Sequence, residues 1–239
     1  MAKLKSLENK VVWITGASSG LGKALARECA LQGAQVVLTS RRYDELESVR
    51  VGLLKPEQHL SIAADITDEA QVRHAHERVL ATKGRIDWLI NNAGLSQRAL
   101  IEETSMHTER AIMEVDYFSQ VFFTKTVLPT LRKQKSGRVV FISSVAGLLG
   151  TQYRATYSAA KAAIHMWANS LRAEVAKEGI EVSVVFPGFV KTNVSFNALN
   201  GEGKPQGHQD EAIENGLDAD VFAQRVVEAL MAGDEYVRS

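Results

Sequence analysis

A tyrosine and a lysine four residues apart form the pair in this sequence that is best suited to moving a proton. Tyr157 and Lys161 lie in the segment YSAAK, and side chains at this spacing share one face of a helix. A free tyrosine titrates near pH ~10, which is too high for proton exchange at neutral pH. An ammonium at ~4 Å, in a medium of effective dielectric constant ~20, favours the phenolate by ~4 kcal/mol. The pair predicts an acid/base tyrosine, although an isolated Tyr–Lys pair more often belongs to an ordinary exposed helix.

A serine beside the tyrosine would complete this chemistry. Ser143 and Ser144 follow the apolar run VVFI, and a serine hydroxyl can hydrogen-bond a reacting oxygen as negative charge develops on it. Side chains alternate between the two faces of a strand, so the two serines point in opposite directions. We prefer Ser144, for the reason of spacing given below.

A glycine-rich turn offers a place for a phosphorylated cofactor. The segment TGASSGLG at residues 15–22 separates an apolar run from a helical stretch. Small residues let the backbone approach a pyrophosphate, whose charge is favourable at the N-terminus of the following helix. The spacing is G-x-x-x-G-x-G rather than the G-x-G-x-x-G of the standard dinucleotide fingerprint, and an ordinary strand-to-helix turn is the alternative.

These groups need a scaffold that brings strand ends together. Short apolar runs, several of them nearly continuous, predict strands buried on both faces at 11–15, 36–39, 60–63, 86–90, 139–143 and 182–186. Helical patterns lie at 21–31, 44–54, 68–82, 108–133, 155–177 and 218–231. The alternation predicts a single α/β domain over residues 1–239, a Rossmann-type doubly wound parallel sheet with helices on both faces. The polar, glycine-rich stretch within 194–216 predicts a mobile substrate loop inside that domain.

Four motifs in chain order resemble the classical type of the short-chain dehydrogenase/reductase family. They are TGASSGLG, then NNAG at 91–94, then Tyr157 and Lys161 as Y-x-x-x-K, and finally Pro187-Gly188 with Thr192 beyond. Ser144 precedes Tyr157 by thirteen residues, the interval usual in the family. The match covers roughly residues 8–195. Each motif is weak by itself, but each follows the strand that the fold requires.

The resemblance implies a role for each catalytic candidate. Tyr157 would be the acid/base, Lys161 would also hold the nicotinamide ribose, and Ser144 would position the substrate. The segment MEVDYF resembles the stretch that usually carries a catalytic asparagine, and here Asp116 takes that place. A carboxylate adds a negative charge that opposes phenolate formation. Alternatively, Asp116 is an ordinary helix residue and the alignment is slightly displaced.

The resemblance also implies NADP(H) as cofactor. Members that use NAD usually carry an acidic residue at the end of the second strand, where this chain has Ser40 followed by Arg41 and Arg42. Guanidinium groups bind phosphate oxygens by charge-assisted hydrogen bonds. The implied cofactor-binding residues are Gly16, Ser18, Ser19, Gly20, Leu21, Gly22, Ser40, Arg41, Arg42, Asp65, Ile66, Asn92, Ala93, Gly94, Val115, Tyr157, Lys161, Pro187, Gly188, Val190 and Thr192.

The amino-acid composition argues against several other classes of protein and kinds of site. Lys and Arg total 28, as do Asp and Glu, so no net positive charge favours nucleic acid or an anionic membrane. A single cysteine, Cys29, cannot form an intrachain disulfide, and no metal-binding spacing or membrane-spanning apolar run occurs. We expect a cytoplasmic homodimer or homotetramer, as in the family, acting on a small carbonyl or alcohol. The alternative is an NADP(H)-binding protein with little turnover.

Overall fold

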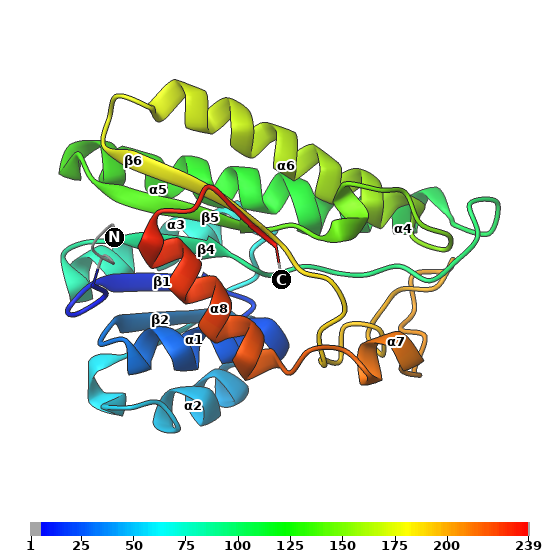
Figure 1. The fold of residues 1–239 in the computed structure, drawn as a ribbon, viewed down its shortest axis with the longest axis horizontal. Helices are drawn as coiled ribbons and strands as arrows, with labels where there is room; N and C mark the ends of the chain where they lie inside the picture. The colour runs from blue at the N-terminus through cyan, green and yellow to red at the C-terminus, as the bar shows by residue number, and fades with distance from the viewer. Residues whose placement is uncertain (1–5, 239) are drawn as a thin grey trace.

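Seven parallel strands form one sheet in the computed structural model, which describes residues 6–238 (Figure 1). Their spatial order is β3-β2-β1-β4-β5-β6-β7. The strands span β1 Val11–Thr15, β2 Gln35–Ser40, β3 Leu60–Ala63, β4 Trp88–Asn91, β5 Gly137–Ile142, β6 Ile180–Phe186 and β7 Tyr236–Arg238. The central strands are buried throughout because helices cover both faces. The predicted doubly wound fold is confirmed.

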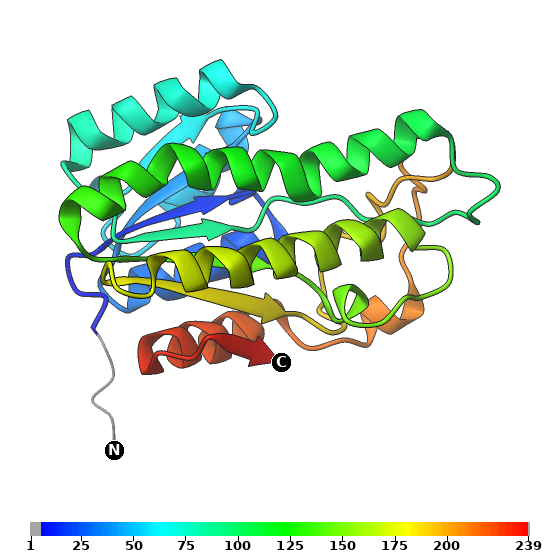
Figure 2. The same ribbon diagram turned by 90° about the horizontal axis from the view of Figure 1, so that it is seen from above.

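Helices divide between the two faces of the sheet. One face packs against α1 (Gly20–Leu31), α2 (Tyr43–Val51) and α8 (Ala219–Ala232). The other face is covered by α3 (Glu69–Lys83), α5 (Ser119–Gln134) and α6 (Ala155–Val175), which lie side by side in Figure 2. The shorter helices are α4 (Met106–Met113) and α7 (Glu211–Glu214). Short 3-10 helices, η1 (Pro56–Gln58) and η3 (Val145–Gly147), complete the chain.

The structure corrects the long helix predicted at 108–133. The helical segment begins at Met106 and contains a π-helical turn, η2 (Glu114–Phe118), between α4 and α5. A π turn holds one more residue than an α turn and occurs often at functional sites. The apolar pattern of the sequence predicted one continuous helix and did not mark this turn.

Two short elements were absent from the sequence prediction. Strand β7 has three residues, and α7 has four, both too short to show a period. The segment 194–216 also has defined partners. Leu199 bridges to Gln97 and to Pro205, and Arg98 N donates to Leu199 O at 2.8 Å. The predicted mobility of this segment stays a prediction.

The point where the sheet reverses its winding order lies between β1 and β4. Ligands of doubly wound sheets bind at the carboxyl ends of the strands at such a point. The glycine-rich turn follows β1, the NNAG segment follows β4, and Ser143-Ser144 follow β5. The fold therefore gathers the predicted motifs at one edge of the sheet.

Candidate active site

Helix α6 places Tyr157 and Lys161 over the ends of β4 and β5. Lys161 is almost fully buried, and its Nζ donates to Ile142 O at 3.1 Å. The same Nζ lies 3.6 Å from Asp116 Oδ1 and 5.7 Å from the centroid of the Tyr157 ring. The ammonium is therefore fixed between a backbone carbonyl and a carboxylate, beside the tyrosine ring.

The two serines have different surroundings, as strand alternation requires. Ser143 Oγ donates to Lys161 O at 2.9 Å and thereby ties β5 to α6. Ser144 Oγ accepts from Ala146 N at 3.1 Å. A hydroxyl that accepts one hydrogen bond still has its own hydrogen to donate. Ser144 is thus held in place with a free donor, whereas the hydroxyl of Ser143 is committed to the scaffold.

Asp116 lies inside the π-helical turn η2 and is completely buried. Its Oδ1 accepts from Leu95 N at 2.9 Å and faces Lys161, while its buried Oδ2 has no hydrogen-bond partner among residues 6–238. Burial raises the pKa of this carboxyl, and the Lys161 ammonium opposes that rise. The structure thus brings Asp116 to the lysine, which the alternative of a displaced alignment did not foresee.

Gly94 leaves the space that this cluster needs. A Cβ added there would lie 2.6 Å from Asp116 Oδ1 and 3.1 Å from Lys161 Nζ. Both approaches are tighter than ordinary van der Waals contact. The glycine of the NNAG segment therefore permits the carboxylate and the ammonium to meet against the backbone after β4.

The glycine-rich turn is closed by contacts from β1 and β4. Thr15 Oγ1 accepts from Asn92 N and Ala93 N at 3.0 and 3.1 Å, and Asn92 Nδ2 donates to Thr15 O at 2.9 Å. Gly16 has φ +65°, and a Cβ at Gly22 would lie 2.2 Å from Gly16 O. The first turn of α1 can pack this closely only without a side chain. The result is a backbone cradle at a helix N-terminus, which suits a pyrophosphate.

Three polar residues lie at the end of β2, where the adenosine ribose is expected. Ser40 ends the strand, and its Oγ accepts from Arg42 N at 3.3 Å. Arg42 Nη2 lies 3.4 Å from Ser18 Oγ in the glycine-rich turn and 2.7 Å from Glu45 Oε2. The Arg41 side chain is exposed and has no hydrogen bond or ion pair within residues 6–238. Arg41 is thus the freer of the two cations.

The other predicted residues line the same edge. Asp65 Oδ1 accepts from Thr67 N and Thr67 Oγ1, which fixes the turn after β3. Thr192 lies 3.4 Å from the position of a Cβ at Gly20, so the segment after β6 touches the glycine-rich turn. The rest follow strand ends or flank the motifs, namely Ser19, Leu21, Ile66, Val115, Pro187, Gly188 and Val190. No comparison tests their assignment, and it stays a prediction.

Sequence reasoning missed one polar network beside the tyrosine. Gln97 is fully buried and accepts from the backbone at the start of α6, while Arg98 and Arg154 both contact the Asp210 carboxylate. Arg98 and Asp210 are 112 residues apart in the chain. No motif connects them, and only their meeting in space reveals the network.

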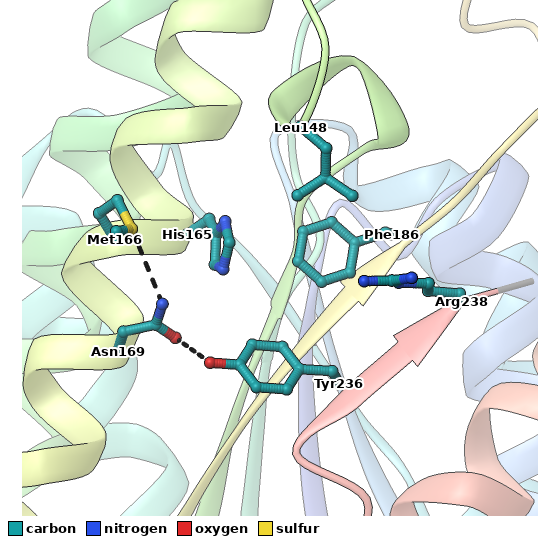
Figure 3. Close-up of a pocket in the computed structure, with 7 residues that line it drawn as sticks. All are labelled: Leu148, His165, Met166, Asn169, Phe186, Tyr236 and Arg238. Atoms are coloured by element: carbon teal, nitrogen blue, oxygen red, sulfur yellow. Dashed lines mark hydrogen bonds between the residues drawn. The ribbon is translucent and has the colours of Figure 1, made fainter.

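A pocket of about 340 Å³ lies elsewhere, between α6, β6 and β7 (Figure 3). His165 packs edge-on against Phe186 there, with ring centroids 5.0 Å apart. Tyr236 Oη donates to Asn169 Oδ1 at 2.8 Å. None of the residues drawn in Figure 3 is a predicted site residue. Within residues 6–238, no cluster of three His, Cys, Asp or Glu side chains could hold a metal ion.

Comparisons with known proteins agree with this geometry. The family model described as short chain dehydrogenase matches residues 10–202. A Drosophila melanogaster protein named dehydrogenase/reductase SDR family protein 7-like is 41% identical over 94% of this chain and 71% of its own. The Xenopus laevis dehydrogenase/reductase SDR family member 7B is 38% identical over 96% of this chain and 74% of its own.

Two solved structures share the fold. A short-chain dehydrogenase from Streptomyces avermitilis is 31% identical with a TM-score of 0.84, over 97% of this chain and 88% of that chain. A short chain dehydrogenase/reductase from Burkholderia phymatum, solved with NAD, has a TM-score of 0.86 at 24% identity, over 98% of this chain and 89% of that chain.

Proposed function

The chain belongs to the short-chain dehydrogenase/reductase family of oxidoreductases, and from this premise we propose that it interconverts a carbonyl and a secondary alcohol with NADP(H). The observation that carries the proposal is the grouping of Tyr157, Lys161 and Ser144 at the switch point of the sheet, beside the glycine cradle. Gly16 and Gly22 let the turn pack tightly against its neighbours, because a Cβ would lie 2.8 Å from Ala93 Cα at Gly16 and 2.2 Å from Gly16 O at Gly22. The compact turn leaves backbone N–H groups at the N-terminus of α1, which suit a pyrophosphate. The residues present therefore fit a nicotinamide dinucleotide.

In the proposed reaction the protein supplies proton transfer and positioning. When bound, a nicotinamide cofactor would supply the hydride transfer. Tyr157 gives a proton to the carbonyl oxygen during reduction and takes it back during oxidation. Ser144 donates its free hydrogen to the same oxygen, and Lys161 stabilises the phenolate form of Tyr157. The N-terminus of helix α1 and the glycine-rich turn before it would hold the pyrophosphate.

The direct test is turnover. Incubation of the purified protein with NADPH and a panel of aldehydes and ketones should consume NADPH in the presence of at least one carbonyl. The runner-up is a cofactor-binding protein with little turnover, which the buried Asp116 beside Lys161 favours. NADPH binding without consumption across a broad panel would support the runner-up.

The Asp116 carboxylate is expected to move the pH profile of alcohol oxidation to higher pH. Burial raises the pKa of this carboxyl, and in its ionised form it partly cancels the positive charge of Lys161. Asp116→Asn removes the negative charge, so the phenolate should form more readily. We expect the rate profile to move to lower pH by up to about one unit, which corresponds to ~1.4 kcal/mol.

This measurement compares the pH dependence of kcat for the variant and the parent protein over the same buffers. An unchanged profile would mean that Asp116 does not influence the ionisation that limits the rate. Glu114→Gln, in the same π-helical turn, removes a charge outside the buried cluster and is the matched control.

We also propose that the protein forms a homodimer or homotetramer. A pocket on α4 and η2 exposes apolar side chains, with Met106 61% and Phe118 53% exposed. In members of the family that this chain resembles, the two long helices that correspond to residues 108–133 and 155–177 form the subunit interface. Measurement of molar mass in solution by light scattering tests the proposal.

The expected substrate is a small carbonyl or alcohol. We propose no nucleic-acid partner, because the formal net charge is zero. Residues 6–238 contain no helix with the length and apolar character needed to cross a membrane. A cytoplasmic location is our proposal from the single cysteine, which gives no sign of an oxidising compartment.

A further inference from the structure

Helix α6 begins without a side-chain cap from its own sequence. Its N-cap residue is Arg154, whose side chain makes no capping hydrogen bond. The first N–H groups of a helix have no partner within the helix and usually bond to a neighbouring Ser, Thr, Asn or Asp. The helix that carries Tyr157 therefore obtains its cap from elsewhere.

That cap comes from Gln97 in the loop after β4. Gln97 is 0% exposed, and its Oε1 accepts from Thr156 N at 2.9 Å and from Tyr157 N at 3.3 Å. The second of these amides belongs to the proposed acid/base residue itself. The Gln97 Nε2 donates to Thr104 Oγ1 at 3.0 Å, and this second contact fixes the orientation of the Gln97 side-chain amide.

The same loop is attached to segment 194–216. Gln97 forms a backbone bridge with Leu199, flanked by hydrogen bonds from Leu199 N to Ser96 O and from Arg98 N to Leu199 O, both 2.8 Å. The Arg98 guanidinium makes an ion pair with Asp210, with Nε at 2.8 Å from Oδ2. Residues 96–98 thus touch both the catalytic helix and this segment.

Arg154 provides a second contact between the start of α6 and Asp210 in segment 194–216. Its Nη2 lies 3.3 Å from the same Oδ2 of Asp210 that Arg98 contacts, and it stands three residues before Tyr157. The side chains of Arg98, Arg154 and Asp210 are 12%, 20% and 21% exposed. Solvent screens such partly buried ion pairs less than it screens surface pairs.

We propose that Gln97 is a positioning residue for Tyr157, and that the Leu199 and Asp210 contacts couple this positioning to segment 194–216. The inference rests on the proposed role of Tyr157 as acid/base. A buried amide that holds the backbone N–H of Tyr157 fixes where the phenol stands at the end of β5. Proton transfer requires the donor within hydrogen-bond reach of the reacting oxygen, so loss of the cap should lower kcat.

The test compares two substitutions of Gln97 in the full-length protein. Gln97→Met keeps the length of the side chain and removes the acceptor, and we expect kcat to fall about 10-fold or more, with the dissociation constant of NADPH nearly unchanged. Gln97→Glu keeps an acceptor oxygen and should recover most of kcat at its own optimum. The new negative charge near Tyr157 should also move its pH profile to higher pH.

A matched control separates positioning from stability. Asp68 caps α3 through Ala70 N and Gln71 N, the same two positions of a helix that Gln97 serves on α6. Asp68→Ala should lower the melting temperature and leave kcat within about 2-fold. Equal losses of kcat in the Asp68→Ala and Gln97→Met variants, or a normal kcat in Gln97→Met, would overturn the positioning role.

The coupling is tested by a double-mutant cycle with Asp210→Asn, which weakens both ion pairs of Asp210. We expect Asp210→Asn to raise KM for the carbonyl, and its effect on kcat to be smaller in the Gln97→Met background than in the parent. Independent, multiplicative effects would contradict the coupling. If the parent protein does not turn over any carbonyl, the proposed function fails. If Tyr157→Phe leaves turnover normal, the acid/base role of Tyr157 fails, and this inference fails with it. If Tyr157→Phe abolishes turnover but Gln97→Met does not lower it, only this inference fails.

Discussion

Tyr157→Phe is expected to lower kcat at least ~10²-fold while leaving the affinity for NADPH nearly unchanged. The phenol hydroxyl is the only group removed, and we expect the ring, which lies 5.7 Å from Lys161 Nζ in the parent, to stay in place. Lys161 would keep its contacts with Ile142 O and Asp116. Removal of a proton donor raises the barrier of the chemical step without disturbing the pyrophosphate cradle.

The measurement is steady-state turnover of the purified variant with the best carbonyl of the panel, together with a cofactor titration. Tyr153→Phe is the control, because Tyr153 is 47% exposed and lies two residues before the first residue of α6. Turnover near that of the parent in Tyr157→Phe would remove Tyr157 from the mechanism. A loss in both variants would indicate damage to the start of α6 instead.

Arg41→Ala should weaken NADPH far more than NADH. The two cofactors differ by the 2′-phosphate alone, and the exposed Arg41 at the end of β2 has no competing partner among residues 6–238. A hydrogen bond to a charged group contributes roughly 1.5–3 kcal/mol, or about 10- to 150-fold in affinity. The lower end is expected for this change alone, because Arg42 can take over part of the contact.

The double change Arg41→Ala with Arg42→Ala should approach the upper end of that range. Glu45 already pairs with Arg42 at 2.7 Å, which reduces what Arg42 contributes by itself. Fluorescence titration of both cofactors in moderate salt gives the affinities. Arg132→Ala, which removes a cation paired with Glu178 at the far end of α5, controls for a general loss of charge. Equal weakening of NADH and NADPH, or a parent protein that prefers NADH, would refute NADP(H) selection.

Much of the fold could be predicted from the sequence, because the positions of strands and helices depend on local residue patterns. Continuous apolar runs predicted six of the strands, and all six, such as Val11–Thr15 and Leu60–Ala63, lie within two residues of their expected limits. Asp68 caps α3 with its side chain, and Gly33 and Gly179 have positive φ where helices give way to strands. A strand that is buried on both faces consists almost entirely of apolar residues, so it can be recognised in the sequence. Strand β7 could not be recognised in this way, because three residues are too few to show a hydrophobic pattern.

The family and the positions of its motifs could also be predicted from the sequence. The TGASSGLG turn, the NNAG segment and the Tyr157–Lys161 pair are each short, contiguous stretches, and their order in the chain follows the order of the strands. The family is confirmed by the comparisons. Cofactor choice and the roles of the individual residues stay predictions that the variants above test.

Only the tertiary structure decided which polar groups meet. The family resemblance placed Asp116 near the tyrosine, but only the structure shows its approach to Lys161, from a π-helical turn and in space that Gly94 leaves free. Gln97 caps a helix that begins nearly 60 residues later, since the Thr156 amide lies 59 positions along the chain. Such contacts depend on three-dimensional distance and on the exclusion of water. Periodicity and short motifs describe neighbours along the chain, and so they cannot encode these contacts.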